Sequence, residues 1–293
     1  MKRSTRIFLR SFVISLVIAA AAASFIILTQ IPSYEKTAPS SSFPSRSFEP
    51  SENDKFNLLV SIARSQGDAP YAYFILGFKG RERQIAVTRL FPETLLSHAG
   101  QQKIILKECF DKGGAGGAAR ALGNFFSINL SKYICFTNDS FISFCEQFEP
   151  AVIDVPENLS QTDRARDLYI KIDRGRQIMG GMLMLDYIAY SRWDGGDSEA
   201  LFEGARLICE FIRQNHSALA LSEGGNAEKF ILGSTQTNLS VTDIEARREL
   251  LSYLLKDSPI SPDCLEIGGE FGAQYTEFIL SGASVIKISA RYS

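Results

Sequence analysis

The chain has few of the side chains that most enzymes use for acid–base or metal chemistry. Its only histidines are His98 and His216, which lie far apart in the sequence. A Ser-His-Asp triad, a Cys-His pair or a histidine-ligated metal therefore has little to build on. Any chemistry must be carried by carboxylates, arginine and lysine.

Cysteine is also sparse, and no two cysteines form a C-x-x-C pair. The five are Cys109, Cys135, Cys145, Cys209 and Cys264. An odd, unpatterned set is typical of small buried apolar residues, and it disfavours a disulfide framework or a zinc site.

Neither of the common nucleotide-binding glycine motifs, G-x-x-x-x-G-K-[ST] and G-x-G-x-x-G, is present. The glycine-rich residues 113–117 predict a turn that opens a helix over residues 118–126. Backbone N–H groups at such a turn can cradle a phosphate. Tight packing of a helix entry is the commoner reason for such glycines, and both interpretations stay open.

A surplus of positive charge is missing as well. The net charge is −2, and four cations precede the first apolar run, which leaves −6 on the rest of the chain; they are Lys2, Arg3, Arg6 and Arg10. An acidic body without a helix-turn-helix pattern argues against nucleic acid as the main partner, because that binding depends on phosphate neutralisation.

Residues 12–31 carry no charge over about 20 positions, which as a helix would span about 30 Å, the thickness of the membrane hydrocarbon. We expect residues 1–11 to form a cytoplasmic basic tail, residues 12–31 one transmembrane helix, and the body to lie outside the cell membrane. A cleaved signal peptide is the alternative, since residues 20–23 are small; the apolar run continues through residues 25–28 and favours the anchor.

Residues 32–54 are rich in proline and serine and predict a linker. The folded domain is expected over residues 55–293. Strand-like runs at 56–62, 71–78, 84–90, 132–136, 151–155 and 169–172 are interspersed with helical runs at 140–148, 180–189, 201–214 and 242–255. The last thirty residues look like short strands and turns. This order predicts a three-layer α/β/α sandwich with a mixed central sheet.

Residues 169–197 carry the most informative pattern. A strand and a turn lead into an apolar helix that ends at Tyr190-Ser191-Arg192, followed by a Gly-Gly loop with Asp194 and Asp197. An arginine held where a buried helix ends suits the binding of an anionic head group. The alternative is that Arg192 caps its own helix through the helix dipole.

This stretch resembles the LytR-CpsA-Psr family of membrane-anchored cell-envelope proteins, and the likeness covers most of residues 56–293. The matching positions are Ile172, Gly175, Ile178, Gly180, Met184, Leu185, Tyr190 and Arg192. The resemblance implies a polyprenyl-phosphate lipid or linked glycopolymer as ligand, its tail buried between sheet and helices. It also implies Mg²⁺ and phosphoryl transfer of the glycopolymer to peptidoglycan at the cell membrane.

Specific residues follow from the resemblance. Arg89 and Arg192 match the family's phosphate-binding arginines, and Lys103, or else Lys107, matches its lysine. Among the carboxylates, Asp68 matches a catalytic and metal-site aspartate, and Asp197, the second catalytic candidate, matches the aspartate that begins the next helix.

The match has gaps at positions where the family carries charge. The family's second arginine after the tyrosine is Asp194 here, and its Arg, Arg and Gln at the next helix start are Ala200, Glu203 and Gly204. Two functions therefore stay open: a glycopolymer transferase, and a catalytically inactive binding or scaffold protein that regulates envelope assembly.

Overall fold

The protein is described by a computed structural model that covers residues 48–97, 103–164, 168–220, 225–256 and 261–293. The expected basic tail and transmembrane segment, residues 1–31, lie outside these ranges. Within these ranges, no helix combines the length and apolar character needed to cross a bilayer. The described end of the expected linker contacts the domain, because the ring of Phe48 lies 5.7 Å from that of Tyr253.

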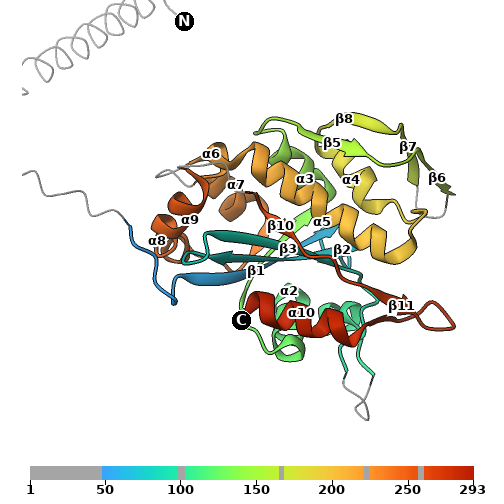
Figure 1. Ribbon diagram of the computed structural model, residues 1–293, viewed down its shortest axis with the longest axis horizontal. Helices are drawn as coiled ribbons and strands as arrows, with labels where there is room; N and C mark the ends of the chain where they lie inside the picture. The colour runs from blue at the N-terminus through green and yellow to red at the C-terminus, as the bar shows by residue number, and fades with distance from the viewer. Residues whose placement is uncertain (1–47, 98–102, 165–167, 221–224, 257–260) are drawn as a thin grey trace, which may run out of the picture. The chain divides into compact units, whose positions relative to one another are not determined.

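A six-stranded sheet forms the centre of the domain (Figure 1), with the order β10-β3-β2-β1-β4-β9. Its strands are β1 (Lys55–Ala63), β2 (Ala72–Lys79), β3 (Gln84–Leu90), β4 (Lys132–Thr137), β9 (Gln236–Thr237) and β10 (Asp263–Cys264). β2 runs antiparallel to both β1 and β3, whereas β4 is parallel to β1. The predicted mixed sheet is confirmed, and the carboxyl ends of β1, β3 and β4 meet at one edge.

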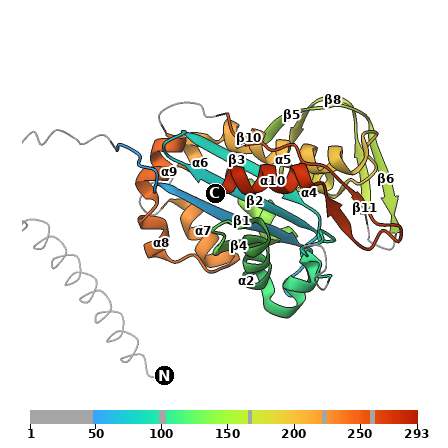
Figure 2. The same ribbon diagram turned by 60° about the horizontal axis from the view of Figure 1, so that its bottom comes forward.

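Helices cover both faces of the sheet, because the strand residues alternate between two apolar cores. On β2, Phe74, Leu76 and Phe78 face one core, while Tyr73 and Ile75 face the other. The first core lies under α3 (Asn138–Cys145), α4 (Gly181–Ala189) and α5 (Gly196–Gln214). The second lies under α2 (Leu106–Phe126) and α10 (Gly282–Tyr292), and Figure 2 shows α10 lying across this face of the sheet.

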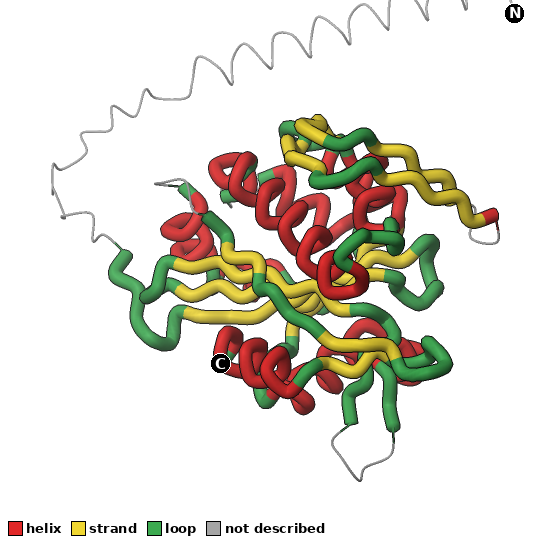
Figure 3. Tube along the Cα trace, turned by 45° about the vertical axis from the view of Figure 1, so that its right-hand side comes forward, coloured by secondary structure: helices red, strands yellow, loops and turns green. Residues whose placement is uncertain are grey.

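Short elements complete the domain. The helices α6 (His216–Leu219), α7 (Asn226–Ser234), α8 (Val241–Glu245) and α9 (Arg248–Leu255) gather near the end where β1 begins. Three two-stranded sheets pair β5 (Ala151–Val155) with β8 (Gly175–Met179), β6 (Leu159–Asp163) with β7 (Leu168–Ile172), and β11 (Gly269–Phe271) with β12 (Phe278–Leu280). The β5–β8 and β6–β7 pairs make an arm that projects from the domain (Figure 3).

The glycine-rich stretch forms a turn between two helical segments, the second of which covers the predicted helix at residues 118–126. α2 begins at Leu106 and continues to Phe126, with a kink where Gly113 and Gly114 leave helical geometry. Gly114 has φ +59°, a left-handed conformation that glycine adopts without strain. The turn at these glycines therefore opens the second segment of α2, and a Cβ at Gly117 would lie 2.6 Å from the carbonyl oxygen of Cys109, which fits the alternative of tight packing at a helix entry.

The prediction of short strands and turns at the C-terminal end is wrong for residues 282–292, which form the helix α10. Ser281 caps this helix by accepting a hydrogen bond from the backbone N–H of Ser284. Ile288 and Tyr292, one turn apart, are buried against the sheet. The Tyr292 ring lies so close to Gly77 that a Cβ there would be 2.7 Å from it. The β-branched residues of this stretch suggested strands, but their spacing fits a helix.

Candidate functional site

A cavity of about 870 Å³ lies at the edge where β1, β3 and β4 end. Open α/β sheets bind ligands at the carboxyl ends of their parallel strands, so the position favours a binding site. Its charged lining residues are the cations Arg64, Arg89 and Lys107 and the carboxylates Glu93, Asp139, Asp186 and Asp197. We call this the head cavity.

Arg89, near the end of β3, is the most deeply buried charge of the head cavity. Its side chain is 4% exposed, and its guanidinium donates hydrogen bonds of 2.6 Å to the carbonyl oxygens of Ile188 and Ala200. Its Nε has no hydrogen-bond partner in the described structure. Burial lowers the pKa of Arg89 to about 10, so the side chain stays charged at neutral pH. Arg89 therefore joins α4 and α5 to the sheet and places a positive charge in the wall.

The close packing of α5 on Arg89 requires a glycine. A Cβ added to Gly204 would lie 2.5 Å from Cδ of Arg89 and 2.6 Å from its Nη1. No real Cβ contact is that short, so the helix can approach the guanidinium only where no side chain intervenes.

Asp186 and Tyr71 face the head cavity from α4 and from the residue that precedes β2. Burial raises the pKa of Asp186, since desolvation disfavours its charged form. Burial likewise raises the pKa of Tyr71, whose hydroxyl donates a 3.0 Å hydrogen bond to Oδ1 of Asn138. Both groups were missed by sequence reasoning. A lone carboxylate in the otherwise apolar helix at residues 182–189 is the pattern that could have identified Asp186.

The structure brings together two of the residues expected from the sequence. Arg89 and Asp197 both line the head cavity, and so does Lys107, the alternative to Lys103. Asp68 is exposed, and its Oδ2 accepts a 3.1 Å hydrogen bond from the backbone N–H of Ser65. It does not appear in the described lining of the cavity.

Lys103 and Arg192 are likewise outside the described lining of the head cavity. The Lys103 ammonium forms a 2.6 Å ion pair with Glu277. Arg192 is exposed beyond the end of α4, where its carbonyl oxygen accepts a 2.9 Å hydrogen bond from the hydroxyl of Tyr190.

Near the start of α5, where the family has arginines, the side chain of Glu203 contacts other residues of the domain. The buried carboxylate of Glu203 accepts a hydrogen bond from the hydroxyl of Tyr187 and forms a 2.5 Å ion pair with Arg206. Arg206 also donates to the carbonyl oxygen of Asp154 at 2.9 Å, which ties α5 to the arm. Glu203 and Arg206 therefore neutralise each other, and neither is in the described lining of the head cavity.

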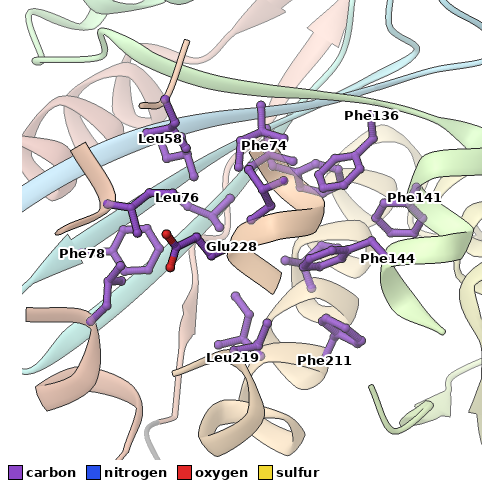
Figure 4. Close-up of a pocket in the computed structure, with 18 of the residues that line it drawn as sticks. Leu58, Phe74, Leu76, Phe78, Phe136, Phe141, Phe144, Phe211, Leu219 and Glu228 are labelled. Atoms are coloured by element: carbon purple, nitrogen blue, oxygen red, sulfur yellow. The ribbon is translucent and has the colours of Figure 1, made fainter. Parts of the chain in front are cut away.

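A second, apolar cavity of about 210 Å³ lies between the sheet and the helices of the first core. Figure 4 shows aromatic and aliphatic side chains from both layers around it, with the carboxylate of Glu228 among them. Residues close together in the sequence line the two cavities. Ile62 lines the apolar cavity and Arg64 the head cavity. On α4, Met184 lines the apolar cavity and Leu185 the head cavity.

No group of three or more His, Cys, Asp or Glu side chains in the described residues could hold a metal by itself. Mg²⁺, however, is usually bound by one or two carboxylates together with substrate phosphates. Asp186 and Asp197 both line the head cavity and supply oxygen ligands of that kind. The residues present fit a Mg²⁺ ion that arrives with a phosphate ligand.

Comparison with known proteins agrees with this architecture. The model of the LytR_cpsA_psr family matches residues 82–262, more than half of the chain. The chain belongs to this family. Membership implies a role in cell-wall glycopolymer biogenesis. Sequence comparison with curated proteins gives no match.

Solved structures share the fold at low sequence identity. A protein of Eubacterium siraeum described as a transcription regulator has a TM-score of 0.73 at 18% identity, covering 84% of this chain and 95% of that one. B. subtilis TagV has a TM-score of 0.60 at 17% identity, with 81% and 95% coverage. TagT bound to LI-WTA has a TM-score of 0.61 at 12% identity, with 85% and 92% coverage. At these identities the likeness concerns the fold alone.

The packing of α5 on Arg89 predicts that Gly204→Ala destabilises the domain. The new methyl group must displace a guanidinium held by two carbonyls, which should cost about 1–3 kcal/mol. Chemical denaturation measures this change. Gly233→Ala is the matched control: no atom lies within 4 Å of the position that its new methyl group would take, and it should stabilise α7 by up to about 1 kcal/mol. Equal effects of the two substitutions would contradict the account of Arg89.

The raised pKa of Asp186 predicts a pH-dependent effect of Asp186→Asn. The carboxyl group binds its proton more tightly when folded, so it opposes folding increasingly as pH rises above its unfolded pKa of about 3.9. The melting temperature of the variant, relative to the wild type, should therefore rise as the pH is raised above about 4. Asp173→Asn, at an exposed turn, is the control. A difference that stays constant with pH would refute the desolvation of Asp186.

Proposed function

We propose that this protein binds a polyprenyl-phosphate or -pyrophosphate lipid that carries a glycopolymer, outside the cell membrane. One observation carries the proposal: the head cavity, with three cations in its wall, and an apolar cavity along the sheet are lined by neighbouring residues of the chain. A phosphate head with a long apolar tail is the ligand that this pair of cavities matches. Family membership and the LI-WTA ligand of TagT support the same ligand class.

The tail would occupy the apolar cavity. Its lining extends along β1 from Ile62, beside the head cavity, to Phe56 at the far end. Six strand steps of about 3.3 Å give a length of about 20 Å. Each CH₂ group buried there contributes about 0.8 kcal/mol, so the tail would supply much of the affinity.

The head group would lie against Arg64, Lys107 and Arg89. Guanidinium and ammonium groups form charge-assisted hydrogen bonds with phosphate oxygens, each worth roughly 1.5–3 kcal/mol. Arg89 already donates two of its N–H groups to carbonyls, so its contribution would be mainly its charge. Arg64 and Lys107, both at the exposed rim, would make the direct contacts.

Transfer of the glycopolymer would require an acceptor hydroxyl on peptidoglycan. The hydroxyl oxygen would attack the phosphorus that carries the glycopolymer, the bond to the lipid phosphate would break, and polyprenyl phosphate would leave. Asp186, whose raised pKa suits proton transfer, would accept the proton of the hydroxyl. A Mg²⁺ ion held by Asp197 would offset the negative charge of the phosphates.

Anchoring at the cell membrane follows from the apolar residues 12–31 and their cationic flank. The linker would then hold the domain on the outer side, where both the lipid-linked polymer and peptidoglycan are available. The proposal thus places the protein at the cell membrane with its amino terminus in the cytoplasm.

Binding without transfer is the second candidate. The four carboxylates of the head cavity outnumber its three cations, and the arginines expected at the start of α5 are absent. A cavity with that balance favours phosphate binding only when a cation accompanies the ligand. The protein would then act as a scaffold that regulates envelope assembly.

Mass spectrometry of the lipids that co-purify with the detergent-extracted full chain tests the proposal. The wild type should carry polyprenyl phosphates. Lys107→Ala should reduce the amount bound about tenfold or more, because one charge-assisted bond is lost. Ile231→Trp, which fills the apolar cavity, should do the same.

Lys103→Ala is the matched control, since Lys103 lies four residues before Lys107 in the sequence but outside the described cavity lining. It should leave the lipid in place. Arg192→Ala tests the assignment made from the sequence. If Arg192→Ala removes the lipid while Lys107→Ala does not, the head group binds beyond the end of α4. Absence of any polyprenyl lipid from the wild type would refute the proposal.

A further inference from the structure

The rim of the head cavity carries an exposed aromatic side chain whose backbone is strained. Tyr275 lines this cavity, yet its side chain is 78% exposed. Its φ is +54°, in the left-handed region that bulky residues rarely adopt. That conformation costs a residue other than glycine roughly 1–2 kcal/mol. Strain of this kind is often retained where a side chain binds a ligand.

The turn that holds Tyr275 is well fixed. Gly272 and Glu277 close it with a 2.9 Å backbone hydrogen bond, and the N–H of Tyr275 donates to the carbonyl oxygen of Gly272 at 2.8 Å. The two strands that flank the turn, β11 and β12, are paired antiparallel. The Tyr275 ring is therefore presented by a defined turn.

An aromatic cluster of Phe91, Phe271 and Phe278 packs against this turn. The Phe271 ring lies 5.9 Å from that of Tyr275 and 5.2 Å from that of Phe278. The Phe91 ring, at the end of β3, lies 5.0 Å from Phe278. The cluster connects the turn to the strand that carries Arg89, so Tyr275 is positioned relative to the head cavity.

The head cavity, with Tyr275 at its rim, suits a sugar. A pyranose ring offers an apolar face that stacks on an aromatic ring, and hydroxyl groups at its edge that need polar partners. The head cavity supplies such partners in Glu93, Asn138 and Asp139. The exposed Tyr275 ring would stack on the apolar face of the sugar, and the polar groups would bind its hydroxyls.

We propose that Tyr275 stacks on the first sugar ring attached to the lipid phosphate and so distinguishes glycosylated from bare lipid. This inference rests on the proposed function, because it places the phosphate in the head cavity. Tyr275 is a specificity-determining residue in this scheme. It has no part in tail binding, since it is not in the described lining of the apolar cavity.

Two probes test the assignment with the full-length protein: farnesyl diphosphate, and the same diphosphate bearing one N-acetylglucosamine. Dissociation constants are measured for the wild type, Tyr275→Phe and Tyr275→Asn. Asparagine tolerates the left-handed backbone, so Tyr275→Asn should melt no lower than the wild type while lacking the ring. Phenylalanine keeps the ring and loses the hydroxyl.

Tyr275→Asn should weaken the glycosylated probe about three- to tenfold and leave farnesyl diphosphate unchanged. Tyr275→Phe should bind both probes as the wild type does. If Tyr275→Asn weakens both probes equally or neither, or if Tyr275→Phe behaves like Tyr275→Asn, sugar stacking is refuted while lipid binding stands. If the wild type binds neither probe, the proposed function fails, and this inference fails with it.

Discussion

The hydrogen bonds from Arg89 to two backbone carbonyls determine the arrangement of the candidate site. They join the end of β3 to the last turn of α4, through Ile188, and to the first part of α5, through Ala200. Gly204 lets α5 come close enough for this contact. Because a buried guanidinium must find acceptors or lose stability, the two helices are held at the sheet edge. Both helices contribute residues to the wall of the head cavity.

The position of α4, fixed by Arg89, explains why one cavity is apolar and the other charged. α4 contributes Met184 to the apolar cavity and Asp186 to the head cavity, so one helix separates tail from head. The charges that the family would place on α5 are replaced by Glu203, which pairs with Arg206 and Tyr187 inside the fold. In the proposed function, direct contacts to phosphate would therefore come from Arg64 and Lys107 at the rim of the head cavity.

Much of the fold could be predicted from the sequence. The strands at residues 56–62, 71–78 and 84–90 follow from short apolar runs between polar turns, and the mixed sheet follows from their alternation with helices. The C-terminal helix was missed because β-branched residues such as Val285 and Ile286 favour strands locally, whereas burial of Ile288 and Tyr292 against the sheet decides for a helix. Local propensity does not contain that tertiary contact.

The candidate site could be predicted less completely. Arg89 and Asp197 were found because each stands at a matched position beside an element end, but Lys107 was only an alternative to Lys103, and Asp186 was missed. Which of two lysines four residues apart faces a cavity depends on where α2 begins, and its first segment, before Gly113, was not predicted. Pattern matching identifies candidate charges; packing selects among them.

Photoaffinity labelling tests most directly whether the two cavities form one lipid site. The probe is a prenyl diphosphate with a diazirine at the end of a tail long enough to span the apolar cavity, irradiated with the full-length protein. The account predicts labelling around Phe56, Phe78 and Leu251, at the far end of the apolar cavity, and its loss when Ile231→Trp fills that cavity. Labelling of α2 or α10, on the opposite face of the sheet, would contradict it.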